Sequence, residues 1–205
     1  MNSGERGQAY TLEAVVAAIV LLTAVAFALQ VTIVTPLSAS TSSQHIEGQQ
    51  RAVAQGVLAS AAEDGSLERA VLYWNETGER FHNTVGQGFY TDDPPDNEFG
   101  DKLEQAFTQE GIAYNVIVRY QAQNGDINQE TMILQGTPSD NAVSATRTIT
   151  LDNDTRLVDE DGSRNETTVR EADGLYIRRG PQPQSEPDSP AVYNVVVVEV
   201  IAWRI

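Results

Sequence analysis

The sequence predicts an α+β fold in which a long N-terminal hydrophobic helix is followed by a helix-packed antiparallel β-sheet head. Three observations predict it. Residues 14–34 carry no charge and hold only three polar side chains. Residues 46–61 and 99–107 place apolar side chains at helical spacing. From residue 112 the apolar residues alternate with polar ones, which is the period of a strand.

The first apolar stretch has the length of a transmembrane helix. As a helix, residues 14–34 extend about 31 Å, close to the thickness of the hydrocarbon core of a bilayer. Three interpretations remain open: a signal peptide that is removed, a plain membrane anchor, and a helix retained after a short leader is cut away. Leu37-Ser38-Ala39-Ser40 resembles a signal-peptide cleavage site, although the apolar run is longer than signal peptides usually carry.

The flank that precedes this stretch favours the third interpretation. Residues 6–13, Arg-Gly-Gln-Ala-Tyr-Thr-Leu-Glu, resemble the class III signal of archaeal type IV pilins and pseudopilins. The resemblance implies that a prepilin peptidase cuts between Gly7 and Gln8. It also implies that Glu13 pairs with the new N-terminal ammonium of a neighbouring subunit. Glu13 is the sixth residue after this cut, and becomes the fifth, as is usual in the family, if the cut precedes Ala9.

Composition and layout of the remaining chain resemble haloarchaeal pilin-like proteins. The resemblance implies a membrane-anchored, non-enzymatic subunit of a surface filament or pseudopilus, with membrane lipid and other pilin-like subunits as partners and its head outside the cell. The alternative is an anchored extracellular binding domain that never polymerises. The expected organisation is a leader, a transmembrane pilin-like helix, a helical spine extension and an α+β head, over residues 1–7, 8–35, 36–65 and 66–205.

The charge balance excludes some partners. The formal net charge is −16, and the single lysine, Lys102, stands against twelve arginines. Binding to nucleic acid depends on lysines and arginines that displace counterions, so we expect none. An acidic, lysine-poor surface suits concentrated salt, where screening weakens the repulsion between like charges. The sequence therefore favours a halophilic protein.

Local signals set the expected elements of the first half. Pro36 should end or kink the first helix, and a second helix should run from a capping box at Thr41 to a stop at Gly65. Residues 67–74 fit a short helix or strand, and residues 78–95 fit a loop. Asp96 is expected to cap a third helix that ends at Gly111.

The second half is expected to form the sheet. We expect strands at residues 112–120, 131–134 and 143–151, with a turn at Asn124-Gly125 between the first two. The third strand has a Thr/Ser face that should meet water or a neighbouring subunit. Residues 152–173 should form an exposed acidic loop, residues 175–177 a short strand, and residues 180–190 an extended linker. The last run, residues 193–203, should be a central strand buried on both faces.

No residue pattern predicts an enzyme, a metal site or a cofactor. The only two histidines, His45 and His82, lack carboxylates at a metal-binding spacing, and there is no phosphate-binding glycine loop or nucleophile elbow. The acidic segments 152–154 and 159–162 lack the ligand spacing of a calcium loop, so we expect a solvated acidic loop. Sequons at Asn75, Asn153 and Asn165 make these residues glycosylation candidates if the chain is exported.

Overall fold

The structure is a computed structural model that describes residues 3–177 and 192–204. Side chains are described for residues 13–26, 44–177 and 192–204. The chain divides into two compact units, Met1–Ile46 and Glu47–Ile205. The boundary between them falls inside the stretch that we expected to form a helical extension.

Helix α1 runs from Ser3 to Glu63 and continues through Pro36, where the sequence predicts a break. The expectation of a long spine that crosses a membrane is wrong. Among the described residues, no helix combines the length and the apolar character that crossing a bilayer requires.

The last turns of α1 belong to the core of the second unit. Ala54, Leu58 and Ala61 are buried, and their spacing of four and three residues places them on one face of the helix. Gly65 then takes a left-handed conformation, with φ of +77°, and α2 (Ser66–Val71) follows at once. The predicted stop at Gly65 is therefore confirmed.

Helix α3 (Glu98–Ala106) begins one residue later than predicted. The side chain of Asn97, rather than that of Asp96, accepts hydrogen bonds from the backbone N–H groups of Phe99 and Gly100, at 3.1 and 3.0 Å. Phe99 and Leu103 are fully buried. A short 3-10 turn, η1 (Thr108–Glu110), leads to Gly111, whose φ of +68° ends the helical segment as predicted.

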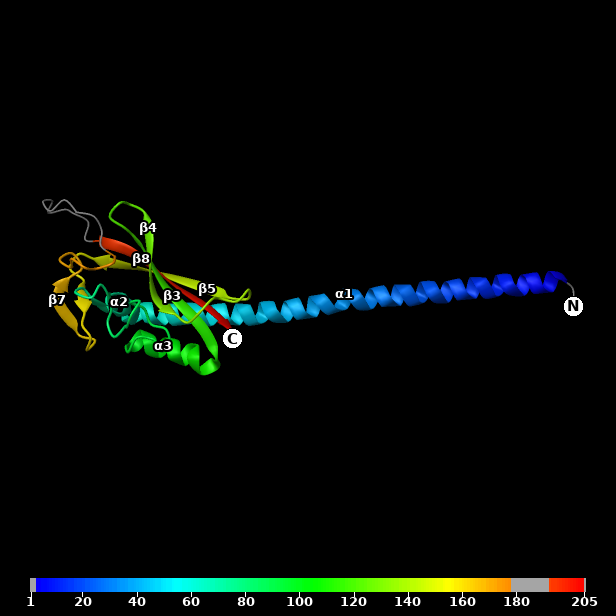
Figure 1. The fold of residues 1–205 in the computed structure, drawn as a ribbon, viewed down its shortest axis with the longest axis horizontal. Coiled ribbons are helices and arrows are strands. Elements are labelled where there is room, and N and C mark those ends of the chain that lie inside the picture. Colours follow the sequence, from blue (N-terminus) through cyan, green and yellow to red (C-terminus); the bar gives the residue numbers. More distant parts are fainter. Residues whose placement is uncertain (1–2, 178–191, 205) are drawn as a thin grey trace. The chain divides into compact units, whose positions relative to one another are not determined.

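The head contains the predicted antiparallel sheet, in the order β4-β3-β8-β5. Its strands are β3 (Ile112–Gln121), β4 (Ile127–Leu134), β5 (Val143–Asp152) and β8 (Val192–Arg204). Figure 1 shows these strands side by side, with α3 and the last turns of α1 next to them. The terminal run is central because it pairs with both β3 and β5. The coarse prediction of an α+β fold with an antiparallel sheet is therefore confirmed.

The two faces of this sheet differ. Val196, Val198 and Val200 of β8 are fully buried, in the same core cluster as residues of α1, α2 and α3. On the opposite face Val195 is 48% exposed, and the Thr/Ser face of β5 is also exposed. The prediction that the last strand is buried on both faces is therefore wrong, because no element of the described chain covers this side completely.

Two small hairpins lie outside the main sheet. Strands β1 (Trp74–Asn75) and β2 (Arg80–Phe81) form one of them. Strands β6 (Arg156–Val158) and β7 (Arg164–Thr168) form the other, within residues 152–173, where the sequence predicts an exposed loop. That prediction is wrong because Leu157, Val158 and Val169 are buried and fix this segment to the core. Residues 175–177 are not a strand, although Leu175 and Ile177 are buried. The linker predicted at residues 180–190 lies outside the described residues.

Candidate functional site

An apolar surface surrounds α1 between Glu13 and Ala26. Every residue of this segment is exposed. Its large side chains are between 53% and 70% exposed: Val15, Val16, Ile19, Val20, Leu21, Leu22 and Val25. Because successive residues of a helix are about 100° apart, these positions surround the helix rather than form one stripe. We call residues 13–26 the apolar segment.

The single hydroxyl within the apolar segment does not interrupt it. The Thr23 Oγ1 atom donates to the carbonyl oxygens of Ile19 and Val20, both at 2.9 Å. A hydroxyl bonded to the preceding turn of its own helix needs no partner outside the helix. The only charge on the segment is that of Glu13, at its N-terminal end.

The residues predicted to act in processing and assembly share one helix. Gly7 and Gln8 lie within α1, and their side chains are outside the described part. Glu13 is exposed at the border of the apolar segment. The sequence alone had identified all three residues, through the basic residue, the glycine and the following carboxylate. Their predicted roles stay predictions.

The three glycosylation candidates belong to the second unit and are half-buried. The side-chain oxygen of Asn75 accepts a hydrogen bond from the Gly78 N–H at 2.8 Å. Asn165 Nδ2, the atom that would carry an oligosaccharide, donates to Asp159 Oδ1 at 3.1 Å. Asn153 lies in the turn between β5 and β6. Glycosylation of Asn165 would leave this nitrogen one N–H, so the sugar would have to be attached on the side that does not face Asp159.

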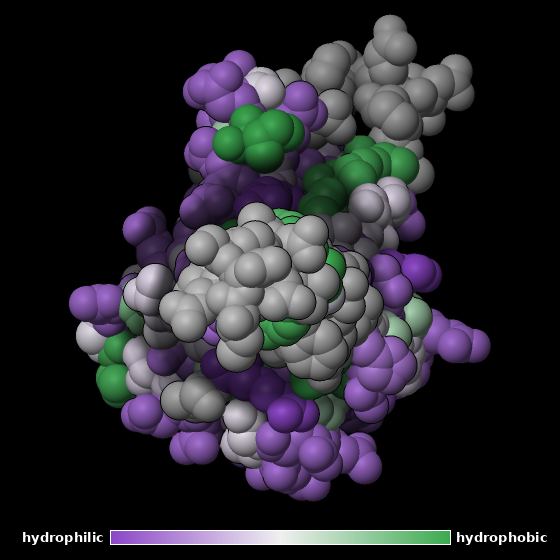
Figure 2. Space-filling view, turned by 90° about the vertical axis from the view of Figure 1, so that its right-hand side faces the viewer, coloured by the Kyte–Doolittle hydropathy of each residue, from purple (hydrophilic) through white to green (hydrophobic). Residues whose placement is uncertain are grey.

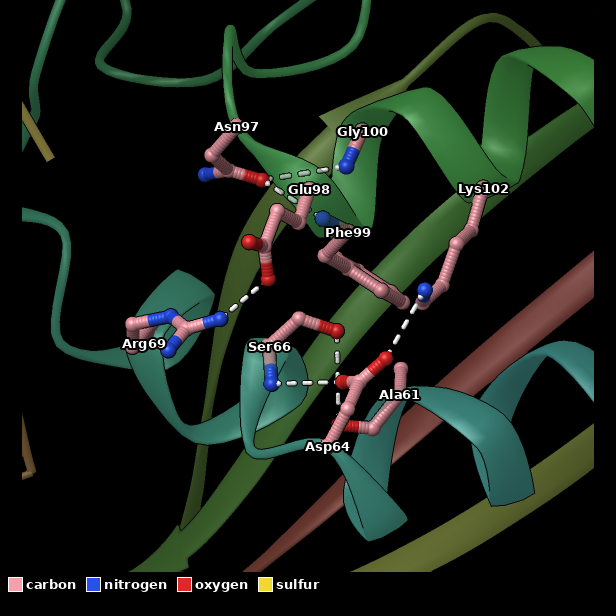
Figure 3. Close-up of polar contacts among 9 residues, drawn as sticks. All are labelled: Ala61, Asp64, Ser66, Arg69, Asn97, Glu98, Phe99, Gly100 and Lys102. Atoms are coloured by element: carbon pink, nitrogen blue, oxygen red, sulfur yellow. Dashed lines mark hydrogen bonds and ion pairs between the residues drawn. The ribbon is translucent and has the colours of Figure 1, made fainter.

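A polar junction fixes the end of α1 to α2 and α3 in the second unit (Figure 3). Asp64 accepts a hydrogen bond from the Ser66 N–H at 2.9 Å and pairs with Lys102 Nζ, also at 2.9 Å. The pKa of Asp64 is held well below its usual range. The main cause is the hydrogen bond with the Ser66 side chain, and the second is the hydrogen bond with the Lys102 ammonium. This places the chain's only lysine at the point where α1 ends.

Further ion pairs hold α2 in place. Arg69 pairs with Glu98 of α3, as Figure 3 shows. Glu68 accepts from Arg164 of β7 at 2.6 Å. Each of these pairs is partly exposed, so each contributes little alone, but together they fix the orientation of α2.

Much of the coloured surface in Figure 2 is hydrophilic. On the face shown in Figure 2, hydrophilic residues predominate and the hydrophobic ones form small separate groups. Like charge keeps copies of the second unit apart in dilute buffer, because residues 47–205 carry all but one unit of the chain's net charge of −16.

Comparison with known proteins identifies a family. A family model described as "Family of unknown function (DUF7288)" matches residues 6–202. No curated protein matches the chain, and no solved structure matches it. The matched range includes the apolar segment as well as the sheet.

Proposed function

The chain belongs to the family DUF7288, whose function is unknown, and from this premise we propose that it is a non-enzymatic, pilin-like subunit that assembles through its N-terminal helix. The observation that carries the proposal is the apolar segment, which is exposed on all sides. The family model matches this segment together with the head, in one range.

The distribution of apolar side chains favours contact with several helices at once. Burial of a large aliphatic side chain contributes about 1.5–3 kcal/mol, so seven such side chains represent a strong driving force for association. A helix that forms a simple dimer needs only one apolar stripe. Because the apolar residues surround this helix, one neighbour would leave much of the surface in water. A bundle of helices in a filament or pseudopilus covers all of it.

Charge supports the same mode of assembly. Contacts between the acidic heads are unfavourable at low salt, so the helices must supply the attraction. Added salt shortens the screening length from about 8 Å at physiological ionic strength to about 3 Å at 1 M, which removes much of the repulsion. The proposed subunits therefore assemble at high salt, with their heads outside the cell.

A pair of glutamate variants tests the assembly surface. Leu22 in the apolar segment and Ile127 in β4 are both 70% exposed. We expect Leu22→Glu to abolish assembly of the full chain in about 1 M salt, because a carboxylate buried between helices is costly. Ile127→Glu adds the same charge at the same exposure and should assemble normally. Sedimentation velocity and electron microscopy measure both. Equal assembly of the two variants would contradict the proposal.

N-terminal sequencing of the protein from its native cell tests the processing. A start at Gln8 or Ala9 supports a cleaved leader, and a start at Met1 or Asn2 contradicts it. A start near Thr41 removes the apolar segment and with it the proposed function.

Glu13→Gln then tests the role of the carboxylate, because it removes the charge and keeps the shape. We expect normal cleavage and reduced assembly. Unchanged assembly would show that Glu13 does not set the position of neighbouring subunits.

A further inference from the structure

A cleft in the second unit combines aromatic rings with carboxylates. Its volume is about 590 Å³, which falls in the usual range for small-molecule sites. It lies between the β1–β2 turn, the end of the β3–β4 hairpin and residues 173–176. Three aromatic residues and three carboxylates line it: Trp74, Tyr120, Tyr176, Glu79, Glu130 and Asp173. Side-chain amides of the hairpin complete the wall.

The aromatic wall is preorganised around Tyr176. The ring centre of Tyr176 lies 4.6 Å from that of Trp74, and the ring of Tyr120 meets it nearly at a right angle at 5.5 Å. Its hydroxyl donates to the Val71 carbonyl oxygen at 3.0 Å. Trp74 and Tyr120 are only 4% and 8% exposed, so a ligand meets a small part of each ring. Because the contacts hold the rings in place, a ligand does not have to order them first.

Gly174 allows this wall to form. A Cβ atom at this position would lie 2.4 Å from the Glu76 carbonyl oxygen, so only glycine fits. The Gly174 carbonyl oxygen also accepts the Trp74 Nε1–H at 2.8 Å. The segment that carries Asp173 and Tyr176 is therefore held directly against the first hairpin.

The electrostatics of the cleft favour a positive charge. None of its lining residues is Lys, Arg or His. Glu130 is half-buried in the wall, and burial raises the pKa of its carboxyl above the usual value. The backbone of Glu79 has a φ of +47°, in the left-handed region. Residues other than glycine adopt this conformation at an energetic cost. A bound cation would offset the desolvation of Glu130.

We propose that this cleft binds a small organic cation, an ammonium compound that contacts the accessible parts of the Trp74, Tyr120 and Tyr176 rings while Glu79 and Glu130 neutralise its charge. Aromatic faces attract such cations through their quadrupoles. A metal ion fits less well, because no group of three or more His, Asp or Glu residues in the described chain is placed to hold one. A neutral sugar would use the rings but leave the carboxylates without a counter-charge.

Calorimetric titration of the full chain with choline chloride tests the proposal, with glucose and calcium chloride as the neutral and metal probes. The change in tryptophan fluorescence reports whether Trp74 is near the bound probe. We expect choline to bind, glucose and calcium to give no heat, and added salt to weaken the choline signal. No choline binding, or binding of glucose as tight as that of choline, overturns the proposal.

Two variants locate the charge that matters. Glu130→Gln and Glu79→Gln keep the size of each side chain, and each should weaken choline binding at least about tenfold. Glu166→Gln changes an exposed carboxylate of β7 outside the cleft and should bind as the unchanged protein does. Thermal unfolding confirms that all three variants are folded, and the exposed position of Glu79 keeps that variant informative if Glu130→Gln fails to fold. Equal affinity in all three overturns the proposal.

Discussion

Asp64 shows how one side chain couples the end of α1 to the rest of the head. It binds the Ser66 N–H and Lys102, and these contacts stabilise its ionised form. Because the pKa of Asp64 is lower in the folded state, its contribution to stability is complete above the unfolded pKa of about 3.9 and disappears as the pH falls through the folded value.

Replacement of Asp64 by Asn therefore has a pH signature. We expect Asp64→Asn to lower the melting temperature modestly at neutral pH, because the ion pair with Lys102 is exposed and screened. The difference from the unchanged protein should shrink as the pH falls below about 4. Thermal unfolding across this range measures it, with the exposed Asp140→Asn as the control. A difference that stays constant with pH would contradict the role given to Asp64.

Two helical glycines give opposite predictions for the same substitution. At Gly100 a Cβ atom would lie 1.8 Å from the Pro95 carbonyl oxygen, so Gly100→Ala must displace the backbone before α3. We expect a loss of about 1–3 kcal/mol. At Gly56 nothing lies within 4 Å, so Gly56→Ala should gain about 0.5–1 kcal/mol through helix propensity. Urea unfolding measures both, and equal effects would contradict the close approach at Gly100.

The cap of α3 marks the limit of sequence reasoning at the residue scale. Asp96 and Asn97 are adjacent, and both are good caps. What decides between them is the path of Pro94-Pro95 and the contact of the Pro95 carbonyl oxygen with the Asn97 N–H, at 2.8 Å. This contact depends on the backbone path just before the helix, which the residue types do not reveal, so the pattern alone predicts the helix but not its first residue.

At the element scale, periodicity predicted the strands that carry long alternating runs. Ile112, Tyr114 and Val116 point to the core as expected, and the Asn124-Gly125 turn joins β3 to β4. The sequence missed the β6–β7 hairpin because its strands have only three and five residues and most of their side chains are polar. A few apolar side chains in a polar stretch do not produce a detectable alternation of apolar and polar residues.

The β6–β7 hairpin gives a test of this correction. Leu157 is fully buried, so Leu157→Ala should cost about 2–5 kcal/mol. Leu134 at the end of β4 is 39% exposed, and Leu134→Ala should cost less than half as much. Chemical denaturation of the two variants provides the comparison. A small effect at Leu157 would restore the interpretation of residues 152–173 as a loop.

At the scale of the whole molecule, the sheet depends on the end of the chain, because β8 lies between β3 and β5. The apolar run predicted that β8 is central in the sheet. It could not predict that the face with Val195 is left uncovered, because this depends on how the other elements pack. The same limit applies to the candidate sites. The class III flank identified Gly7, Gln8 and Glu13, whereas the cleft joins residues from positions 74 to 176 that no local pattern connects.

The division into two units leads to the last prediction. A fragment that starts at Glu47 keeps Ala54, Leu58 and Ala61, the residues of α1 that belong to the core of the head. We expect it to unfold cooperatively and to stay monomeric in about 1 M salt, because it lacks the apolar segment. The full chain should assemble more as salt rises, since screening reduces repulsion between acidic heads while apolar burial persists.

Light scattering of both proteins across a salt series measures this difference. Assembly of the fragment would place the contact in the head, and the exposed outer face of the sheet would then be the surface to mutate. Assembly of the full chain that weakens with salt would point to ion pairs between subunits rather than apolar packing of helices. Only assembly that needs residues 1–46 and strengthens with salt agrees with a subunit whose helix supplies the attraction and whose acidic head supplies the repulsion.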